Sequence, residues 1–305
     1  MTSPTVTITG GGYEAEIALR GGQLLSLTSQ GENLVVPAAQ AEGAFAGAVL
    51  APWPNRVAKS TYVYGEKTYE LTTNEEETGA AMHGLLYDRE LTVQSQRESE
   101  VHLAGTIEAS EGYPFRLEIV LIYRVAADLG LSTTLMARYA PEVEELEGDA
   151  VAPEEAVPAP FGAGFHPYLT AAGAPLNTCR LRLPATTAVT TKASGKVVDR
   201  APVSGDLDLT NGPLLAGRSI DHPFTGLPEE GWTAELIHGP SGLVVRMIAD
   251  TPWVQVYTGE RIDRAGVAVE PMTCPPNAFN SGEDLIHLTP GEWFRVGYSI
   301  EAIRL

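Results

Sequence analysis

Short runs in which apolar and polar residues alternate recur along the whole chain and predict β-strands. Successive side chains of a strand point to opposite faces, so a half-buried strand has a period of two. The clearest pair covers residues 117–125 and 131–138, which we expect to form a hairpin around Asp128-Leu129-Gly130. A second hairpin is predicted over residues 62–71, with its turn at Gly65. Further strands are predicted at residues 6–8, 13–19, 24–27, 34–36, 179–183, 234–238, 243–248, 254–257 and 294–300.

Many short strands separated by turn residues are typical of an all-β sandwich or barrel. The 31 glycines and 22 prolines interrupt every long window that could form a helix. Large sandwiches and barrels often exceed about 200 residues as one domain, so we expect residues 1–305 to form a single domain. The run Gly10-Gly11-Gly12 predicts a turn, because no third glycine at the dinucleotide-binding spacing and no helix pattern follow it.

One segment, from Pro141 to Pro160, differs in composition from the rest. It holds seven acidic residues, four prolines, no basic residue and no aromatic residue. Such a segment buries too little apolar area to offset the entropy of ordering. Since the strand pattern resumes on both sides, we expect residues 141–160 to form a solvated loop inserted between two strands.

The charge of the chain restricts its partners. Thirty-nine acidic residues against 20 basic residues give a formal net charge of -19, which disfavours binding to nucleic acid. No apolar run approaches the roughly 20 residues that a membrane span needs, so we expect no membrane partner. The first residues lack the basic and apolar regions of a secretion signal, and we expect a cytoplasmic protein.

Neither the cysteines nor the histidines predict a metal or a cofactor. Cys179 and Cys274 are too few for a disulfide framework and match no paired zinc spacing. No two histidines are spaced as ligands on one element. We therefore expect reduced, structural cysteines and chemistry without a cofactor.

The candidate catalytic base is Glu270. It closes the apolar run 266–269, and prolines follow at positions 271, 275 and 276. Because proline cannot donate to a sheet ladder, we predict a strand that ends just after Glu270. The alternative is a solvated carboxylate at the rim of a sheet.

Four other polar residues are candidates for the same site. His166 lies between Phe165 and Pro167, a context that favours an extended backbone, and histidine both donates and accepts protons near neutral pH. His83 precedes a glycine that would let a ligand approach the backbone. Asp221 and Arg56 offer a carboxylate and a cation. Taken singly, each also fits a structural role: a hydrogen-bonded histidine, a turn cap for Asp221, and a surface ion pair for Arg56.

In their order along the chain, these pieces resemble the aldose 1-epimerase (galactose mutarotase) family. The resemblance covers nearly the whole chain. It rests on Gly21-Gly22, Asn55-Arg56-Val57-Ala58 before the 62–71 hairpin, His83-Gly84, His166-Pro167-Tyr168, Ile220-Asp221-His222-Pro223-Phe224, residues 254–259, Val269-Glu270 and residues 276–280.

The resemblance implies a large antiparallel β-sandwich, a supersandwich of the galactose mutarotase type, and a metal-free interconversion of sugar anomers. It implies Glu270 as the general base and His166 as the general acid. His83, Arg56 and Asp221 would bind the sugar, and Trp53 or Tyr168 would support its apolar face. The expected partner is a monosaccharide, galactose or glucose, and the expected assembly is a monomer or a homodimer.

Two departures from the family pattern concern the substrate more than the reaction. The acidic segment 141–160 replaces a short turn, and Leu85 stands where a second glycine is frequent. Three alternatives stay open: a hexose-6-phosphate 1-epimerase, which would need a basic cluster for the phosphate; a glycoside hydrolase using Asp221 and Glu270; and a sugar-binding protein without catalysis.

Overall fold

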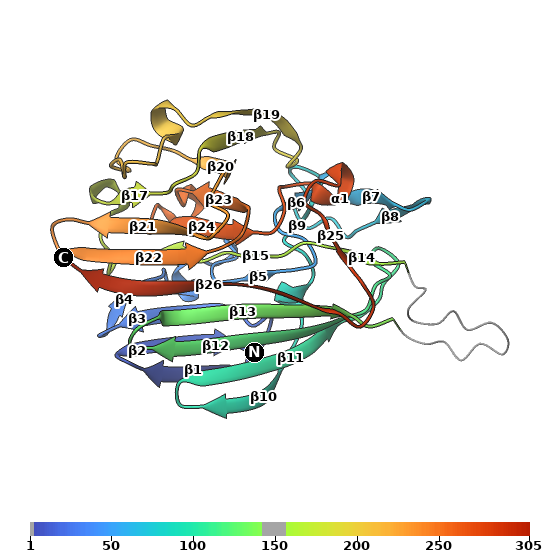
Figure 1. The fold of residues 1–305 in the computed structure, drawn as a ribbon, viewed down its shortest axis with the longest axis horizontal. Helices are drawn as coiled ribbons and strands as arrows, with labels where there is room; N and C mark the ends of the chain where they lie inside the picture. The colour runs from blue at the N-terminus through green and yellow to red at the C-terminus, as the bar shows by residue number, and fades with distance from the viewer. Residues whose placement is uncertain (1–2, 142–156) are drawn as a thin grey trace.

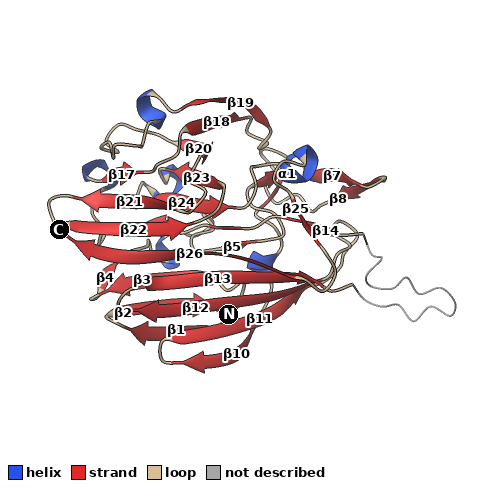
Figure 2. Cartoon of the chain, viewed as in Figure 1, coloured by secondary structure: helices blue, strands red, loops and turns tan. Residues whose placement is uncertain are grey.

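Two large antiparallel β-sheets share one hydrophobic core and make this chain an all-β protein of the sandwich type. The computed structural model describes residues 3–141 and 157–305. Figure 1 shows the two sheets as layers, and Figure 2 shows that helical segments in the described chain are confined to short turns. The all-β sandwich prediction is confirmed.

The first large sheet has long strands whose inner residues alternate with half-exposed ones. In β12 the buried residues Ile119, Leu121 and Tyr123 alternate with half-exposed ones, which is the period of two seen in the sequence. The predicted hairpin is present, and β12 pairs with β13 along its full length. In spatial order the strands are β10 (Thr92–Arg97), β11 (Glu100–Ile107), β12 (Leu117–Ala126), β13 (Gly130–Tyr139), β26 (Trp293–Arg304), β22 (Leu243–Ala249), β21 (Trp232–His238) and β17 (Arg180–Arg182).

The second large sheet is covered on both faces at its centre, where all six residues of β24 are buried. Two short strands, β15 and β16, pair with different parts of β24. In spatial order the strands are β19 (Val197–Pro202), β18 (Thr187–Thr191), β20 (Asp221–Thr225), β23 (Trp253–Tyr257), β24 (Val267–Met272), β15 (Gly164–Phe165) and β5 (Val49–Leu50), with β16 (Tyr168–Leu169) beside β24.

Smaller sheets and turns complete the described chain. The predicted 62–71 hairpin is present as β7 and β8, which pair around Gly65. The remaining strands are β1 (Thr5–Gly10), β2 (Tyr13–Ala18), β3 (Leu24–Ser29) and β4 (Glu32–Asn33) in one sheet, and the pairs β6 (Arg56–Val57) with β9 (Ala81–Met82), β7 (Thr61–Tyr64) with β8 (Lys67–Glu70), and β14 (Ala159–Phe161) with β25 (Ile286–Leu288). One α-helical turn, α1 (Ala278–Ser281), and 3₁₀ turns at Ala38–Gln40, Ala58–Ser60, Leu86–Asp88, Leu176–Thr178, Gly205–Leu207 and Glu260–Ile262 are described.

The core lies between the two large sheets. Leu135 and Ile300 of the first sheet belong to the same buried cluster as Val254, Val256 and Val269 of the second. Burial of apolar side chains is the main force that holds such layers together. No helix in the described residues has the length and hydropathy to cross a membrane.

Three details of the predicted pattern are wrong. Residues 34–36 form no regular strand; Val35 makes an isolated bridge to Leu169 instead. Strand β24 does not end at Glu270 but continues through Pro271 to Met272. The acidic segment was predicted to run to Pro160, yet Pro160 is a buried residue of β14. Residues 142–156 of that segment lie outside the described part of the chain.

Candidate functional site

A polar cavity opens above the second large sheet, with a volume of about 120 Å³. All five residues predicted from the sequence for the site line it. The other lining residues come from loops and from neighbouring strands. The lining consists of Ala44, Phe45, Asn55, Arg56, Glu75, Met82, His83, His166, Tyr168, Asp221, Gln255, Tyr257, Arg261 and Glu270.

Strand register places the polar side chains of the floor on one face. Gln255 of β23 is paired with Glu270 of β24, and two residues along the sheet Tyr257 is paired with Asp221 of β20. Residues directly opposite, or two apart, share a face of a sheet. The intervening valines point to the other face and join the core. The alternation of Val254-Gln255-Val256-Tyr257 in the sequence therefore separates core from cavity.

A break between two short strands brings His166 beside Glu270. Strand β15 contacts β24 at Met272 and β16 contacts it at Ala268, so His166 and Pro167 lie in the gap between them. The His166 backbone is held by Ala48 and Gly47, whose carbonyl and amide lie 3.0 and 2.8 Å away. Its Nε2 atom lies 3.5 Å from Oε1 of Glu270. Because Pro271 has no N–H, β24 runs through this gap without leaving a donor unpaired.

His83 packs edge-on against His166 in the cavity wall. Their ring centroids are 5.2 Å apart, and the ring of Phe45 lies 4.7 Å from His83 on another side. His83 has a left-handed backbone with φ of 65°, and Gly84 follows with φ of 76°. A Cβ atom on Gly84 would lie 2.2 Å from the carbonyl oxygen of Ala51, so only glycine permits this close approach.

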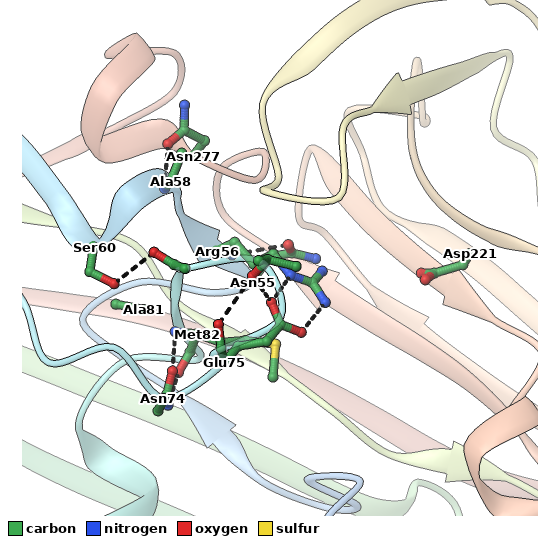
Figure 3. Close-up of polar contacts among 12 residues, drawn as sticks. Asn55, Arg56, Ala58, Ser60, Asn74, Glu75, Ala81, Met82, Asp221 and Asn277 are labelled. Carbon is green, nitrogen blue, oxygen red and sulfur yellow. Dashed lines mark hydrogen bonds and ion pairs between the residues drawn. The ribbon is translucent and has the colours of Figure 1, made fainter.

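Arg56 is held at the cavity by Glu75. Two hydrogen bonds join the guanidinium to the carboxylate, from Nε at 2.5 Å and from Nη2 at 2.6 Å. Figure 3 shows this pair, with Asp221 on a separate strand away from it. Asn74, which precedes Glu75, exchanges two hydrogen bonds with the backbone of Met82 and so fixes the loop. The sequence alternative of a surface partner for Arg56 is wrong, because the Glu75 side chain is 11% exposed.

Asp221 is tied to the floor by Gln255, whose amide Nε2 donates to its Oδ1 at 2.6 Å. Asp221 begins strand β20, so it does not cap a turn. Glu270 and Asp221 thus reach the cavity from the same face of three neighbouring strands, through a chain of register partners. Carboxylates at such positions accept hydrogen bonds from hydroxyl groups.

Burial sets the protonation of the central pair. Burial lowers the pKa of His166 to about 4. Burial, followed by the charge of Asp221, raises the pKa of Glu270 well above its usual range, against the opposing influence of Arg56. Burial also lowers the pKa of His83, assisted by His166 and Arg56. The lowered pKa of His166 and the raised pKa of Glu270 both favour a pair that holds one proton and carries no net charge.

Several buried polar atoms of the cavity have no partner among the described residues. These are Nδ1 of His83, Nδ1 of His166, Oε1 of Gln255 and Oε2 of Glu270. Buried polar groups are otherwise almost always hydrogen-bonded. The four atoms therefore fit a ligand that brings several hydroxyl groups.

Some lining residues were missed by the sequence reasoning. Glu75 and Arg261 lie in loops with no recognisable pattern, and Phe45 follows a run of small residues. Of the two aromatic residues predicted to support a sugar, Tyr168 lines the cavity, while Trp53 is buried behind it and donates its Nε1 to the carbonyl of Ala81. In the described residues no three histidine, cysteine or acidic side chains gather as a metal site requires.

Comparison with known proteins places this architecture in a family. The family model described as aldose 1-epimerase matches residues 4–301. A protein of Escherichia coli (strain K12) called YihR, described as uncharacterized, is 37% identical over 300 residues, which cover 97% of this chain and 92% of that protein. Human galactose mutarotase is 26% identical over 71% of this chain and 63% of its own length. A solved structure of a galactose mutarotase and aldose epimerase homologue from C. elegans superposes with a TM-score of 0.83 over the full length of both chains, at 18% identity. The chain belongs to the aldose 1-epimerase family.

Proposed function

We propose that the protein is an aldose 1-epimerase that interconverts the α and β anomers of a free aldose. The observation that carries the proposal is the buried pair of Glu270 and His166, whose Oε1 and Nε2 atoms lie 3.5 Å apart at the cavity. Anomer exchange needs one group that accepts a proton and one that donates a proton, close to a single carbon atom. A pair that shares one proton between a carboxyl and an imidazole meets this need.

The proposed reaction conserves protons and needs no other reactant. In the ionised form of the pair, with the shared proton on His166, the Glu270 carboxylate accepts the proton of the O1 hydroxyl, His166 donates its proton to the ring oxygen O5, and the bond between C1 and O5 breaks to leave an aldehyde. Rotation about the C1–C2 bond presents the other face of the aldehyde. The reverse transfers close the ring in the other configuration and restore both side chains.

The remaining cavity residues would bind the sugar. Arg56, His83 and Asp221 would contact its hydroxyl groups and ring oxygen. The ring of Tyr168, which stacks against His166 at 5.1 Å, would support the apolar face of the sugar. Galactose and glucose are the first substrates to test.

The decisive experiment is polarimetry on freshly dissolved α-glucose and α-galactose, corrected for the spontaneous rate. We expect Glu270→Gln to fold but to lose about 10²–10⁴-fold in turnover, the usual contribution of one acid-base group. Glu235→Gln is the matched control, because Glu235 is also a buried glutamate but bonds Arg246 outside the cavity. Near-normal turnover of Glu270→Gln would falsify the proposal, and sugar binding without rate enhancement in the wild type would leave a binding protein.

A hexose-6-phosphate 1-epimerase is the second candidate, favoured by one observation. Arg261 also lines the cavity, where its positive charge acts on the neighbouring Glu75 and Tyr168. Its guanidinium adds a cation that the sequence reasoning did not find. Comparing the rates on glucose and glucose 6-phosphate decides between the two. The second candidate requires a clear preference for the phosphate ester that Arg261→Gln removes.

A further inference from the structure

We propose that Glu75 is a positioning residue that fixes the guanidinium of Arg56 for contact with the sugar. This inference rests on the proposed function. It assigns a role to a residue that lines the cavity and accepts two hydrogen bonds from Arg56.

The paired hydrogen bonds from Arg56 to Glu75 fix the orientation of the guanidinium. Two parallel hydrogen bonds, to Oε2 from Nε and to Oε1 from Nη2, define both the position and the plane of the group. They use two of its five N–H donors, which leaves Nη1 and one Nη2 hydrogen for a ligand. No partner of Nη1 is seen among the described residues. Arg56 therefore presents its remaining donors in a set direction.

The loop that carries Glu75 is itself fixed. The Glu75 carbonyl accepts the amides of Thr78, Gly79 and Ala80 at 3.0 to 3.3 Å, and the Thr78 hydroxyl donates to the Glu75 carboxylate. Although burial acts against it, the hydrogen bonds from Arg56 and Thr78 lower the pKa of Glu75. Glu75 is thus an ionised acceptor on a closed turn, unlike a mobile surface carboxylate.

Without Glu75, other carboxylates would compete for Arg56. The charges of Asp221 and Glu270 already raise the pKa of Arg56. The other titratable groups that line the cavity are Arg261, His83, His166, Tyr168, Tyr257 and Glu75 itself. An unpaired guanidinium would turn toward Asp221 or Glu270. A turn toward Asp221, the stronger of the two influences on Arg56, would block a sugar-binding carboxylate and weaken sugar binding.

The test is a double-mutant cycle with Glu75→Ala, Arg56→Ala and the double variant, measured as KM and kcat for galactose. Loss of a charge-assisted contact that acts on the bound sugar predicts a rise in KM of about 10-fold for Glu75→Ala, with kcat within about 3-fold of the wild type. In the Arg56→Ala background the same change should have no further effect, because Glu75 acts only through Arg56.

Glu76→Ala is the matched control, since it removes the same charge from the same loop at an exposed side chain. We expect it to keep the wild-type KM. If Glu75→Ala fails to fold, Glu75→Gln keeps the size of the side chain and enters the same cycle. An unchanged KM in a folded Glu75 variant, or an equal effect with and without Arg56, overturns the inference.

Failure of the proposed function is recognised separately. A wild-type protein that does not accelerate mutarotation refutes the epimerase, whatever Glu75 does. The cycle is then repeated with the dissociation constant for galactose, measured by calorimetry. A 10-fold weaker affinity that depends on Arg56 supports the positioning role, and an affinity independent of Glu75, or no galactose binding in the wild type, overturns it.

Discussion

At the scale of single residues, burial determines how the central pair works. An isolated glutamate in water is ionised at neutral pH, and an isolated histidine is partly charged. In the cavity, burial shifts the pKa of Glu270 upward and that of His166 downward. The uncharged pair and the ion pair contain the same number of protons, so a bound sugar can select either one. The site is therefore set for proton exchange in both directions.

His166→Asn tests the donor half of this pair. Because His166 transfers a proton and contributes less to holding the sugar, we expect kcat to fall by about 10²–10⁴-fold while KM stays within a few-fold. Initial rates by polarimetry over a range of galactose concentrations give both constants. His102→Asn is the control, since His102 lies on the first large sheet and pairs with Glu100. A loss confined to KM would assign His166 to binding.

Sequence reasoning reached the residues that sit in distinctive local contexts. His166 before a proline, His83 before a glycine and Glu270 at the end of an apolar run can be recognised in the chain, and all three line the cavity. Glu75 and Arg261 could not be found this way. Their neighbours are ordinary loop residues, and the role of Glu75 comes from its bond to Arg56, 19 positions away.

At the scale of elements, a discontinuity positions the chemistry. A continuous strand beside β24 would have paired with it along its whole length. Its side chains would then have pointed alternately to the two faces of the sheet. Because β15 ends at Phe165 and β16 begins at Tyr168, His166 forms no register pair with β24, and its side chain faces Glu270. The prolines that follow Glu270 were interpreted as the end of a strand. In the structure, the first of them, Pro271, is a residue of β24, and it lies opposite the gap between β15 and β16 that holds Pro167.

The hairpin of β18 and β19 supports Arg56 from another side. Its turn contains Gly195, which has φ of 86°, and a Cβ atom there would lie 2.8 Å from Cβ of Arg56. We expect Gly195→Ala to displace Arg56 and to raise KM for galactose by about 3- to 10-fold, through weaker binding of the sugar. Steady-state kinetics on the folded variant measures this effect.

Gly31→Ala separates steric contact from backbone strain. Gly31 has a similar φ of 81°, but a Cβ atom there would meet nothing within 4 Å. Because both glycines have a left-handed backbone, Gly31→Ala and Gly195→Ala should each lower the free energy of unfolding by about 1 kcal/mol. Gly31→Ala should nevertheless keep the wild-type KM. Equal KM values for the two alanine variants would show that Gly195 does not act on Arg56.

At the scale of the whole molecule, the buried site makes stability depend on pH. The folded pKa of His166, about 4, lies below the ordinary value of 6.5, so the unfolded chain takes up this proton first. The stability that His166 contributes is complete above about pH 6.5 and is lost as the pH falls toward about 4. Glu270 acts in the opposite direction, because its raised pKa contributes stability at low pH that is lost as the pH rises through that pKa.

Comparing the wild type with His166→Asn isolates the contribution of His166 to the pH dependence of stability. Between about pH 7 and about pH 5, we expect the free energy of unfolding of the wild type to lose about 2 kcal/mol more than that of His166→Asn. Urea unfolding at the two pH values gives the difference. His102→Asn, which changes a half-buried histidine on the first large sheet, should follow the wild type. A His166→Asn protein with the same pH dependence as the wild type would contradict the depressed pKa.

The sequence by itself determined the class of fold and the five polar residues that were predicted to line the site. Periodic burial is a local property of a strand, so the alternation over residues such as 117–125 and 254–257 could be read without coordinates. Tertiary structure alone decided which of these residues meet. Contacts between separate segments of the chain create three features of the site. They are the Arg56–Glu75 pair, the register of Gln255 with Glu270 and the gap that holds His166. The pKa values of the site also depend on such contacts, because desolvation is a property of the assembled cavity and not of any one segment.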